Sequence, residues 1–133
     1  MSKHSGIRAA VINHLKEICP DKFAVIDGLP VFVEQSTLPA LAVYLTEAQY
    51  AGQTVDADDW EAVLHVQVFL KASKPDSELD KCVEDFIYPA VNQNEALGAL
   101  VENIYPIGYD YTRDDEMAFW GSADLTFKIE YTM

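Results

Sequence analysis

The 133-residue sequence predicts an α+β fold, a single domain over residues 1–133 with a mainly antiparallel or mixed sheet and helices packed mostly on one face. The strongest sign is the last segment, residues 120–132, which alternates apolar and polar side chains with the period of a half-buried strand. One face of this strand would carry Ala123, Leu125, Phe127, Ile129 and Tyr131. A second sign is the helical spacing of Ile7, Val11, Leu15 and Ile18 near the start, in a segment that Pro20 ends.

Between these two segments the sequence predicts further strands. Residues 23–26 form a short strand, followed by the turn signal Asp27-Gly28 and a second piece over residues 31–33. Pro30 confines that piece to a sheet edge or to irregular structure, because proline cannot donate to a strand ladder.

Two longer strands follow. Residues 40–45 are nearly all apolar, which indicates a central strand covered on both faces. Apolar side chains recur at every second position over residues 60–70, which predicts a long strand with Trp60 and Leu70 on the same face. An antiparallel ribbon over residues 41–70 is expected, with the polar loop of residues 50–59 at its tip.

The next segment has the signals of a helix start. Ser77 can cap the helix, with Asp80 at the third helical position as a short version of the capping box. Leu79 and Ile87 belong to its apolar stripe, and Tyr88-Pro89 is expected to stop it.

A third helix is expected after a cap at Asn94, with an apolar stripe from Leu97 to Ile104. Pro106 would end this helix, and residues 107–111 would open the penultimate strand. The helices therefore precede two closing strands.

Composition excludes several classes of protein. The chain has 22 Asp and Glu against 9 Lys and Arg, a formal net charge of −13, which argues against ordinary nucleic-acid binding. No apolar run is long enough for a membrane helix, and the N-terminus lacks a signal peptide. The two cysteines, Cys19 and Cys82, lie at apolar helical positions, which favours buried free thiols and a reducing, cytoplasmic compartment.

Catalytic signals are weak, and the sequence predicts no enzyme. The three histidines are scattered, and His65 is expected to be hydrogen-bonded or solvated. Ser122 lacks the following glycine of a nucleophile elbow, and no Walker or dinucleotide-binding glycine pattern occurs.

Carboxylates form three clusters, which lie at residues 56–61, 76–80 and 110–116. Oxygen-only groups suit Mg²⁺ or Ca²⁺, although each cluster alone is more often a solvated loop or a helix start. No cofactor is required. If the protein oligomerises, its assembly is expected to respond to Mg²⁺, because cations screen the repulsion between acidic subunits.

Short motifs in a fixed order resemble the minor tail protein U family, the tail terminators of lambda-like long-tailed phages. The similarity spans almost the whole length and is strongest in Pro75-Asp-Ser-Glu-Leu-Asp80, Ile87-Tyr-Pro89, Gly108-Tyr-Asp-Tyr111, Arg113-Asp-Asp115 and Trp120 with Ser122-Ala-Asp-Leu-Thr126. The resemblance implies a hexameric ring that caps the tail tube, stops its polymerisation and offers the surface that joins the head. It implies a tube protein and a head–tail joining protein as partners, and DNA that passes through an acidic lumen unbound. The protein would act in the bacterial host cytoplasm and in the virion tail.

Residues carried over from the resemblance are candidates for the subunit contact. Asp76, Glu78 and Asp80 are expected at a cation-sensitive contact, with Asp76 first, unless Asp76 is itself the helix cap. Arg113 is expected to form an ion pair with a neighbouring subunit, unless it forms only a weak, solvent-exposed pair at the edge of the interface. Asp114 and Asp115 would face the lumen or the interface.

The loop of residues 50–59 is the candidate for tube contact, unless it is disordered. Two other functions remain open at this point. One is an acidic mimic of DNA that occupies a DNA-binding protein, and the other is a Mg²⁺-dependent hydrolase.

Overall fold

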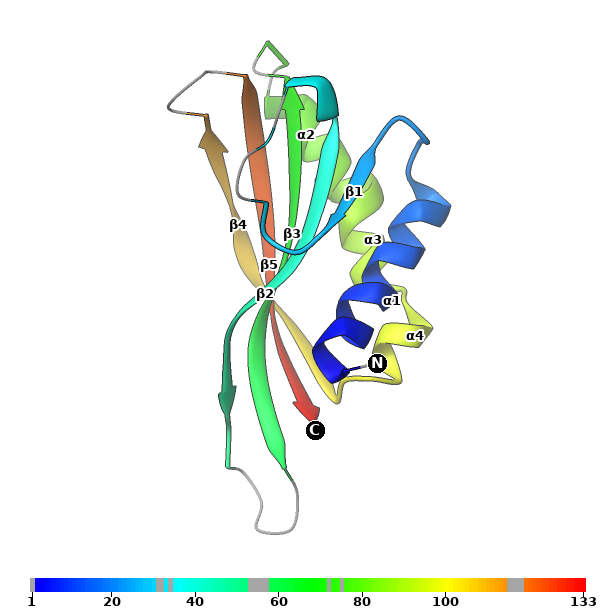
Figure 1. Ribbon diagram of the computed structural model, residues 1–133, viewed down its shortest axis with the longest axis vertical. Helices are drawn as coiled ribbons and strands as arrows, with labels where there is room; N and C mark the ends of the chain where they lie inside the picture. The colour runs from blue at the N-terminus through cyan, green and yellow to red at the C-terminus, as the bar shows by residue number, and fades with distance from the viewer. Residues whose placement is uncertain are drawn as a thin grey trace.

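A layer of helices covers one face of a five-stranded sheet in the computed structural model (Figure 1). The structure describes residues 2–30, 33, 35–52, 58–71, 73–74, 76–114 and 119–133. In chain order its elements are α1 (Lys3–Ile18), β1 (Ala24–Asp27), the 3₁₀ turn η1 (Gln35–Thr37), β2 (Ala40–Tyr50), β3 (Asp59–Lys71), α2 (Asp76–Cys82), the π-helical turn η2 (Val83–Ile87), α3 (Tyr88–Asn92), α4 (Glu95–Gly98), β4 (Asn103–Arg113) and β5 (Trp120–Thr132). The α+β fold class is confirmed.

The strand order is β1-β2-β3-β5-β4. β1 pairs parallel with β2, and all other neighbours are antiparallel, so the sheet is mixed. The C-terminal strand β5 lies between β3 and β4 and pairs with β3 from Trp120 to Thr132. Beyond it, the Met133 amide donates to the Asp58 carbonyl at 3.0 Å. The chain end is thus tied into the sheet, as the alternation in the sequence predicts.

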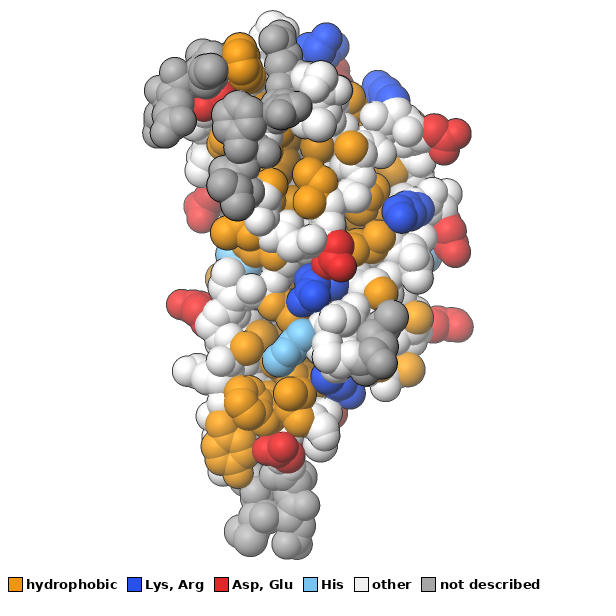
Figure 2. Space-filling view, viewed as in Figure 1, with side chains coloured by type: hydrophobic (Ala, Val, Ile, Leu, Met, Phe, Trp, Pro, Cys, Tyr) orange, Lys and Arg blue, Asp and Glu red, His pale blue; other side chains and the backbone are white. Residues whose placement is uncertain are grey.

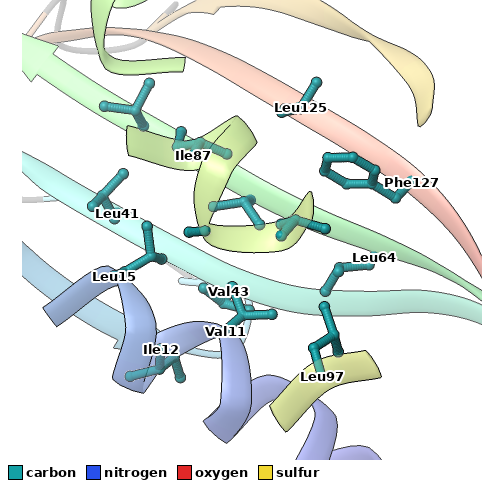
Figure 3. Packing of buried hydrophobic residues seen from close by; sticks show 14 of the residues in the cluster. Val11, Ile12, Leu15, Leu41, Val43, Leu64, Ile87, Leu97, Leu125 and Phe127 are labelled. Atoms are coloured by element: carbon teal, nitrogen blue, oxygen red, sulfur yellow. The ribbon is translucent and has the colours of Figure 1, made fainter. Parts of the chain in front are cut away.

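The main core lies between the sheet and the helices, where Val11 and Leu15 of α1 and Ile87 of η2 meet Leu64 and Phe127 (Figure 3). The residues predicted for the inner face of the last strand are all buried: Ala123, Leu125, Phe127, Ile129 and Tyr131. α1 packs here because its apolar residues recur at helical spacing, and the Ser2 side chain caps it by accepting from the Ser5 amide.

A second, smaller apolar cluster lies on the opposite face of the sheet, called the open face below. Ala40, Ala42 and Tyr44 of β2 form it with Phe69 and Val33. The prediction that residues 40–45 are covered on both faces is therefore confirmed. Of the piece predicted over residues 31–33, residues 31 and 32 lie outside the described residues.

The expected helix stop at Tyr88-Pro89 is wrong, because helical structure continues from Asp76 to Asn92. The intervening turn η2 is π-helical, and the Tyr88 amide donates to the Val83 carbonyl, five residues back. Pro89 then occupies the first turn of α3, where a missing N–H is tolerated. Ser77 lies inside α2 rather than before it, so its expected role as cap is also wrong.

The third helix is shorter than expected. Asn94 caps it, accepting from the Leu97 amide at 3.0 Å, but α4 ends at Gly98 and Ile104 lies in β4. Pro106 does not end a helix; it sits within β4, the last strand of the sheet on this side, which is where a sheet accommodates proline.

Both cysteines are buried free thiols, in agreement with the sequence. Within the described part of the chain, no helix is long and apolar enough to cross a membrane.

Candidate functional site: the β4 edge and the α2–β4 corner

The strand β4 carries an unusual exposed surface. It pairs with β5 on one side and lies at the end of the strand order, so its other side is a sheet edge. No residue of β4 is buried. Among the described residues, eight large hydrophobic side chains are exposed, and four of them lie on this strand: Tyr105, Ile107, Tyr109 and Tyr111. An exposed apolar edge strand is a template for pairing with another chain.

A bulge divides β4 and directs these side chains to two faces. The register with β5 shifts between Pro106 and Gly108, and Gly108 has a φ of 156°. Before the shift, Tyr105 stands opposite Lys128 on the open face. After it, Tyr109 stands opposite Leu125, whose side chain is buried beneath the helices. The bulge therefore aims Tyr109 and Tyr111 toward α2.

At the end of β4 these tyrosines meet the acids predicted for the subunit contact. The Tyr109 hydroxyl donates to Asp80 Oδ1 at 3.1 Å, and the Tyr111 hydroxyl donates to the same oxygen. These hydrogen bonds to Asp80 raise the pKa of the Tyr111 hydroxyl, because an ionised phenol could not donate. We call Asp76, Asp80, Tyr109, Tyr111 and Arg113 the α2–β4 corner.

Arg113 closes the corner by pairing with Asp76 of the same chain. Its Nη2 donates to Asp76 Oδ1 at 2.9 Å, and both side chains are more than half exposed. The register partner of Arg113 is Gly121, where an added Cβ would lie 3.0 Å from Arg113 Nη1. Glycine at this position therefore leaves room for the guanidinium. Whether the pair also reaches a second subunit stays a prediction.

Asp114 has a local role in the turn after β4. Its Oδ2 accepts from the Phe119 amide at 3.0 Å, and its own amide donates to the Trp120 carbonyl at 2.9 Å. The carboxylate thus ties the two ends of the β4–β5 connection together. Asp115 lies outside the described residues.

The cluster proposed for cations is spread around α2 rather than focused on one point. Asp76 contacts Arg113, Asp80 contacts the tyrosines, and Glu78 lines a different hollow, beside Lys74. Among the described residues, no three His, Cys, Asp or Glu side chains are placed to hold a metal ion. A cation effect on assembly would therefore require screening or carboxylates from more than one chain.

The sequence did not predict a polar network that crosses the open face. His65 Nδ1 lies 2.8 Å from Asp124 Oδ2, and His65 Nε2 lies 2.8 Å from Thr46 Oγ1. The His65 ring also stacks on Tyr44, with ring centroids 4.5 Å apart. His65 is therefore hydrogen-bonded, as predicted.

Tyr44 extends this network toward the other end of the sheet. Its hydroxyl lies 2.9 Å from Gln67 Oε1, and Gln67 in turn donates to Ser122 Oγ at 2.9 Å. Burial and then the nearby Asp124 carboxylate raise the pKa of Tyr44. Asp124 Oδ1 is buried without a hydrogen-bond partner among the described residues. The network joins β2, β3 and β5 and fixes their register.

The hydroxyl that is hydrogen-bonded to His65 of the His65–Asp124 pair is Thr46 Oγ1. Ser122 contacts Gln67 and Thr112 rather than His65. The hollow on the open face is lined by Glu47, Gln49, Glu61, Val63, Ile107 and Lys128, without Thr46 or His65. The His65–Asp124 pair therefore serves the sheet.

An exposed edge strand with tyrosines and charged side chains is a kind of surface that assembling proteins use to bind a partner. The comparison with known proteins gives the family. The model of the family described as phage minor tail protein U matches residues 2–131, and the chain belongs to this family.

Two curated relatives cover almost the whole chain. The tail tube terminator protein of Escherichia phage N15 is 45% identical over 98% of this chain and 99% of its own length. The tail tube terminator protein of Escherichia phage lambda is 46% identical over 98% of this chain and 99% of its own length. A solved chain from the virion of a native gene transfer agent particle aligns with a TM-score of 0.45 and 16% identity, covering 96% of each chain.

Proposed function

We propose that this protein is a non-enzymatic assembly protein that caps a phage tail tube, stops its polymerisation and provides the surface that joins the head. The observation that carries the proposal is the full-length identity of 45–46% with two tail tube terminators. The uncovered β4 edge supports it, because a capping protein needs surfaces that remain free in the single chain.

The working form of the protein would be a hexameric ring. A closed ring needs one heterologous interface repeated around an axis, with two different surfaces of the same chain in contact. The β4 edge and the α2–β4 corner supply one such surface. Six copies of a chain with a net charge of −13 would line the lumen with acid, so that DNA passes without adhering.

The remaining partners would be the tail tube protein and a head–tail joining protein. The β2–β3 ribbon extends beyond the helices and is our candidate for tube contact (Figure 1). Tyr50 at its end is exposed and packs edge-on against Trp60, although residues 53–57 lie outside the described residues. Assembly would take place in the bacterial host cytoplasm, before the protein becomes part of the virion tail.

Negative-stain microscopy of the purified protein with Mg²⁺ tests the proposal. Closed rings of uniform diameter are expected. Monomers at high protein concentration in Mg²⁺ would contradict the ring, and a purified tail tube whose elongation continues after addition of the protein would contradict the capping function.

We further propose that Mg²⁺ promotes assembly at the corner, where Asp76 and Asp80 would meet a neighbour. Sedimentation velocity of the parent and of Asp76→Ala, each with Mg²⁺ and with chelator, tests this role. The substitution is expected to weaken assembly, and equal assembly of the two proteins would contradict the assignment. Glu95→Ala is the matched control, because Glu95 is an exposed carboxylate at the start of α4, outside the α2–β4 corner.

The two alternatives from the sequence find no support. A DNA mimic needs carboxylates along a duplex-like stripe, whereas the acids of the corner and Asp58 at the ribbon lie in separate regions. A Mg²⁺-dependent hydrolase needs converging carboxylates, and no such group is present among the described residues.

A further inference from the structure

The acidity of the chain is unevenly distributed. Residues 1–30 contain four Lys and Arg and three Asp and Glu, which gives a net charge of +1. Residues 31–133 contain five Lys and Arg and nineteen Asp and Glu, which gives a net charge of −14. The near-neutral part forms α1 and β1, at one flank of the sheet, and β4 forms the opposite flank. In Figure 2 the Lys and Arg side chains lie over the upper end and the α1 side, while the visible charged side chains on the β4 side are Asp and Glu.

At the flank of α1 and β1 there is a hollow of about 250 Å³ rimmed by lysines. Lys22 comes from the connection between α1 and β1, Lys71 from the end of β3, and Lys74 from the turn that follows. Phe23, Pro39, Leu70 and Cys82 supply apolar surface between them, and Glu78 of α2 is the one carboxylate of the lining, so the three lysines outnumber it. We call this site the lysine-rimmed hollow.

These lysines lack the partners that other cations of the chain have. Arg8, Arg113 and Lys128 each pair with a carboxylate of their own chain. Within the described residues, no carboxylate oxygen lies within 4.0 Å of the Nζ atoms of Lys22, Lys71 or Lys74. Lys3, Lys16 and Lys81 likewise have no ion pair among the described residues, so the distinctive feature of Lys22, Lys71 and Lys74 is that they line one hollow. In a chain with 22 acids and 9 Lys and Arg, this grouping of lysines points to an anionic partner from outside the chain.

The α2–β4 corner has the matching chemistry. Asp76 and Asp80 are its carboxylates, Arg113 is its cation, and the rings of Tyr109 and Tyr111 are exposed beside them. The lysines match the carboxylates, and the apolar surface of the hollow matches the tyrosine rings. A phosphate backbone would use the lysines but leave the apolar surface without a partner, which favours a polypeptide.

The two sites also lie at the same end of the molecule. In Figure 1 the end of β4, the connection between α1 and β1, and the end of β3 are all in the upper part, on different sides of the sheet. Copies related by rotation about an axis along the length of the molecule keep equal heights, so the corner of one copy can face the hollow of the next.

We propose that the lysine-rimmed hollow receives the α2–β4 corner of a second copy of this chain, and that this contact forms the ring. The inference rests on the proposed function, since it names the second surface of the ring interface. Lys22 lies two residues before β1, the other edge strand of the sheet, so the contact would join the two edges of neighbouring sheets.

Charge reversal on each side tests the contact. The hollow variant is Lys22→Glu with Lys74→Glu, and the corner variant is Asp76→Lys with Asp80→Lys. Alone, each variant would place like charges in every interface, and its self-association by sedimentation velocity is expected to fall about tenfold or more. Mixed in equal amounts, the variants can alternate around a ring with every contact of opposite charge, and assembly is expected to return.

The controls separate this inference from the proposed function. Lys3→Glu with Asn13→Asp and Gln93→Glu lowers the net charge by four, as the hollow variant does, at positions outside both sites, and should leave assembly near the parent level. Circular dichroism checks the folding of each variant. If the parent assembles and the two variants assemble equally well, or if folded variants stay apart when mixed, this inference fails and the proposed function stands. If the parent itself stays monomeric in Mg²⁺, both fail.

A labelled DNA duplex distinguishes the other class of partner. No binding of the duplex by the parent is expected. Binding by the parent that is lost in the hollow variant would assign the lysines to phosphates and overturn the inference.

Discussion

β3 and β4 are both antiparallel neighbours of β5, and they differ in almost every other respect. β3 has β2 on its second side, and its residues from Val66 to Leu70 are all buried. β4 has no strand on its second side among the described residues, and none of its residues is buried. Backbone pairing with β5 therefore places β4, while its side chains contribute little to the core. This strand can present tyrosine rings to a partner because the core does not bury them.

The largest expected difference between the two regions comes from truncating a core side chain. Phe127→Ala removes a fully buried ring at the centre of β5 and should lower the free energy of unfolding by about 3–5 kcal/mol. Urea denaturation followed by tryptophan fluorescence, at low protein concentration with chelator, measures the loss in the monomer. Tyr109→Ala on β4 is the control, and a comparable loss there would show that β4 belongs to the core.

The second prediction uses the ionisation of a buried thiol in the helix-covered region. Burial raises the pKa of Cys19 to about 11 from an ordinary value of 9.0, so the folded protein keeps a neutral thiol where the unfolded chain has a thiolate. The stabilisation is complete below pH 9 and is lost as the pH rises toward 11. Unfolding free energies at pH 8 and pH 10.5 should diverge by roughly 1 kcal/mol more in the parent than in Cys19→Ala. Parallel pH profiles would refute this cause.

The ion pair at the corner should have a smaller effect on the single chain. Arg113→Ala is expected to lower the free energy of unfolding by less than about 1 kcal/mol, because both partners are more than half exposed. A double-mutant cycle with Asp76→Ala in the monomer isolates the pair energy. A coupling energy of several kcal/mol would mean that the Arg113–Asp76 pair stabilises the folded monomer and is not merely a solvent-exposed ion pair.

The smallest effect on folding is expected at the bulge of β4. Ile107→Lys replaces an exposed side chain and should change the free energy of unfolding by no more than about 0.5 kcal/mol. A lysine on an edge strand discourages pairing with other chains, so assembly measured by sedimentation should weaken. Unchanged assembly would remove this part of β4 from the interface.

The sequence predicts the helix-covered region well because burial there leaves a periodic pattern. The alternation from Ala123 to Tyr131 and the helical spacing from Ile7 to Ile18 arise because the strand and the helix each have one buried and one solvent-exposed face. Both predictions are confirmed. The order of strands is not readable in the same way. Nothing local in residues 120–132 indicates that this strand lies between β3 and β4 rather than at an edge.

Apart from the cap expected at Ser77, the errors concern two of the three prolines expected to end helices, since α1 does end before Pro20. Pro89 is accommodated after a π-helical turn, and Pro106 lies in an edge strand; both depend on neighbours that are distant in sequence. Treating Pro106 as a stop also hid the alternation of Tyr105, Ile107, Tyr109 and Tyr111. That alternation was the available signal for the exposed strand. The structure brings Asp76, Asp80 and Arg113 together within one chain, a grouping that the sequence did not predict, and their roles between chains stay predictions.

The bulge at Ile107 limits how long a strand can be that adds to β4. A regular partner strand cannot follow the register on both sides of the shift, so it can pair either with Asn103–Pro106 or with Gly108–Arg113. The second segment is the longer of the two, with six residues, and the edge strand β1 at the other flank has four. An edge interrupted in this way favours recognition by a short strand and disfavours the continuous stacking that leads to fibres. One extra residue in a strand thus limits the length of regular edge that β4 offers to another chain.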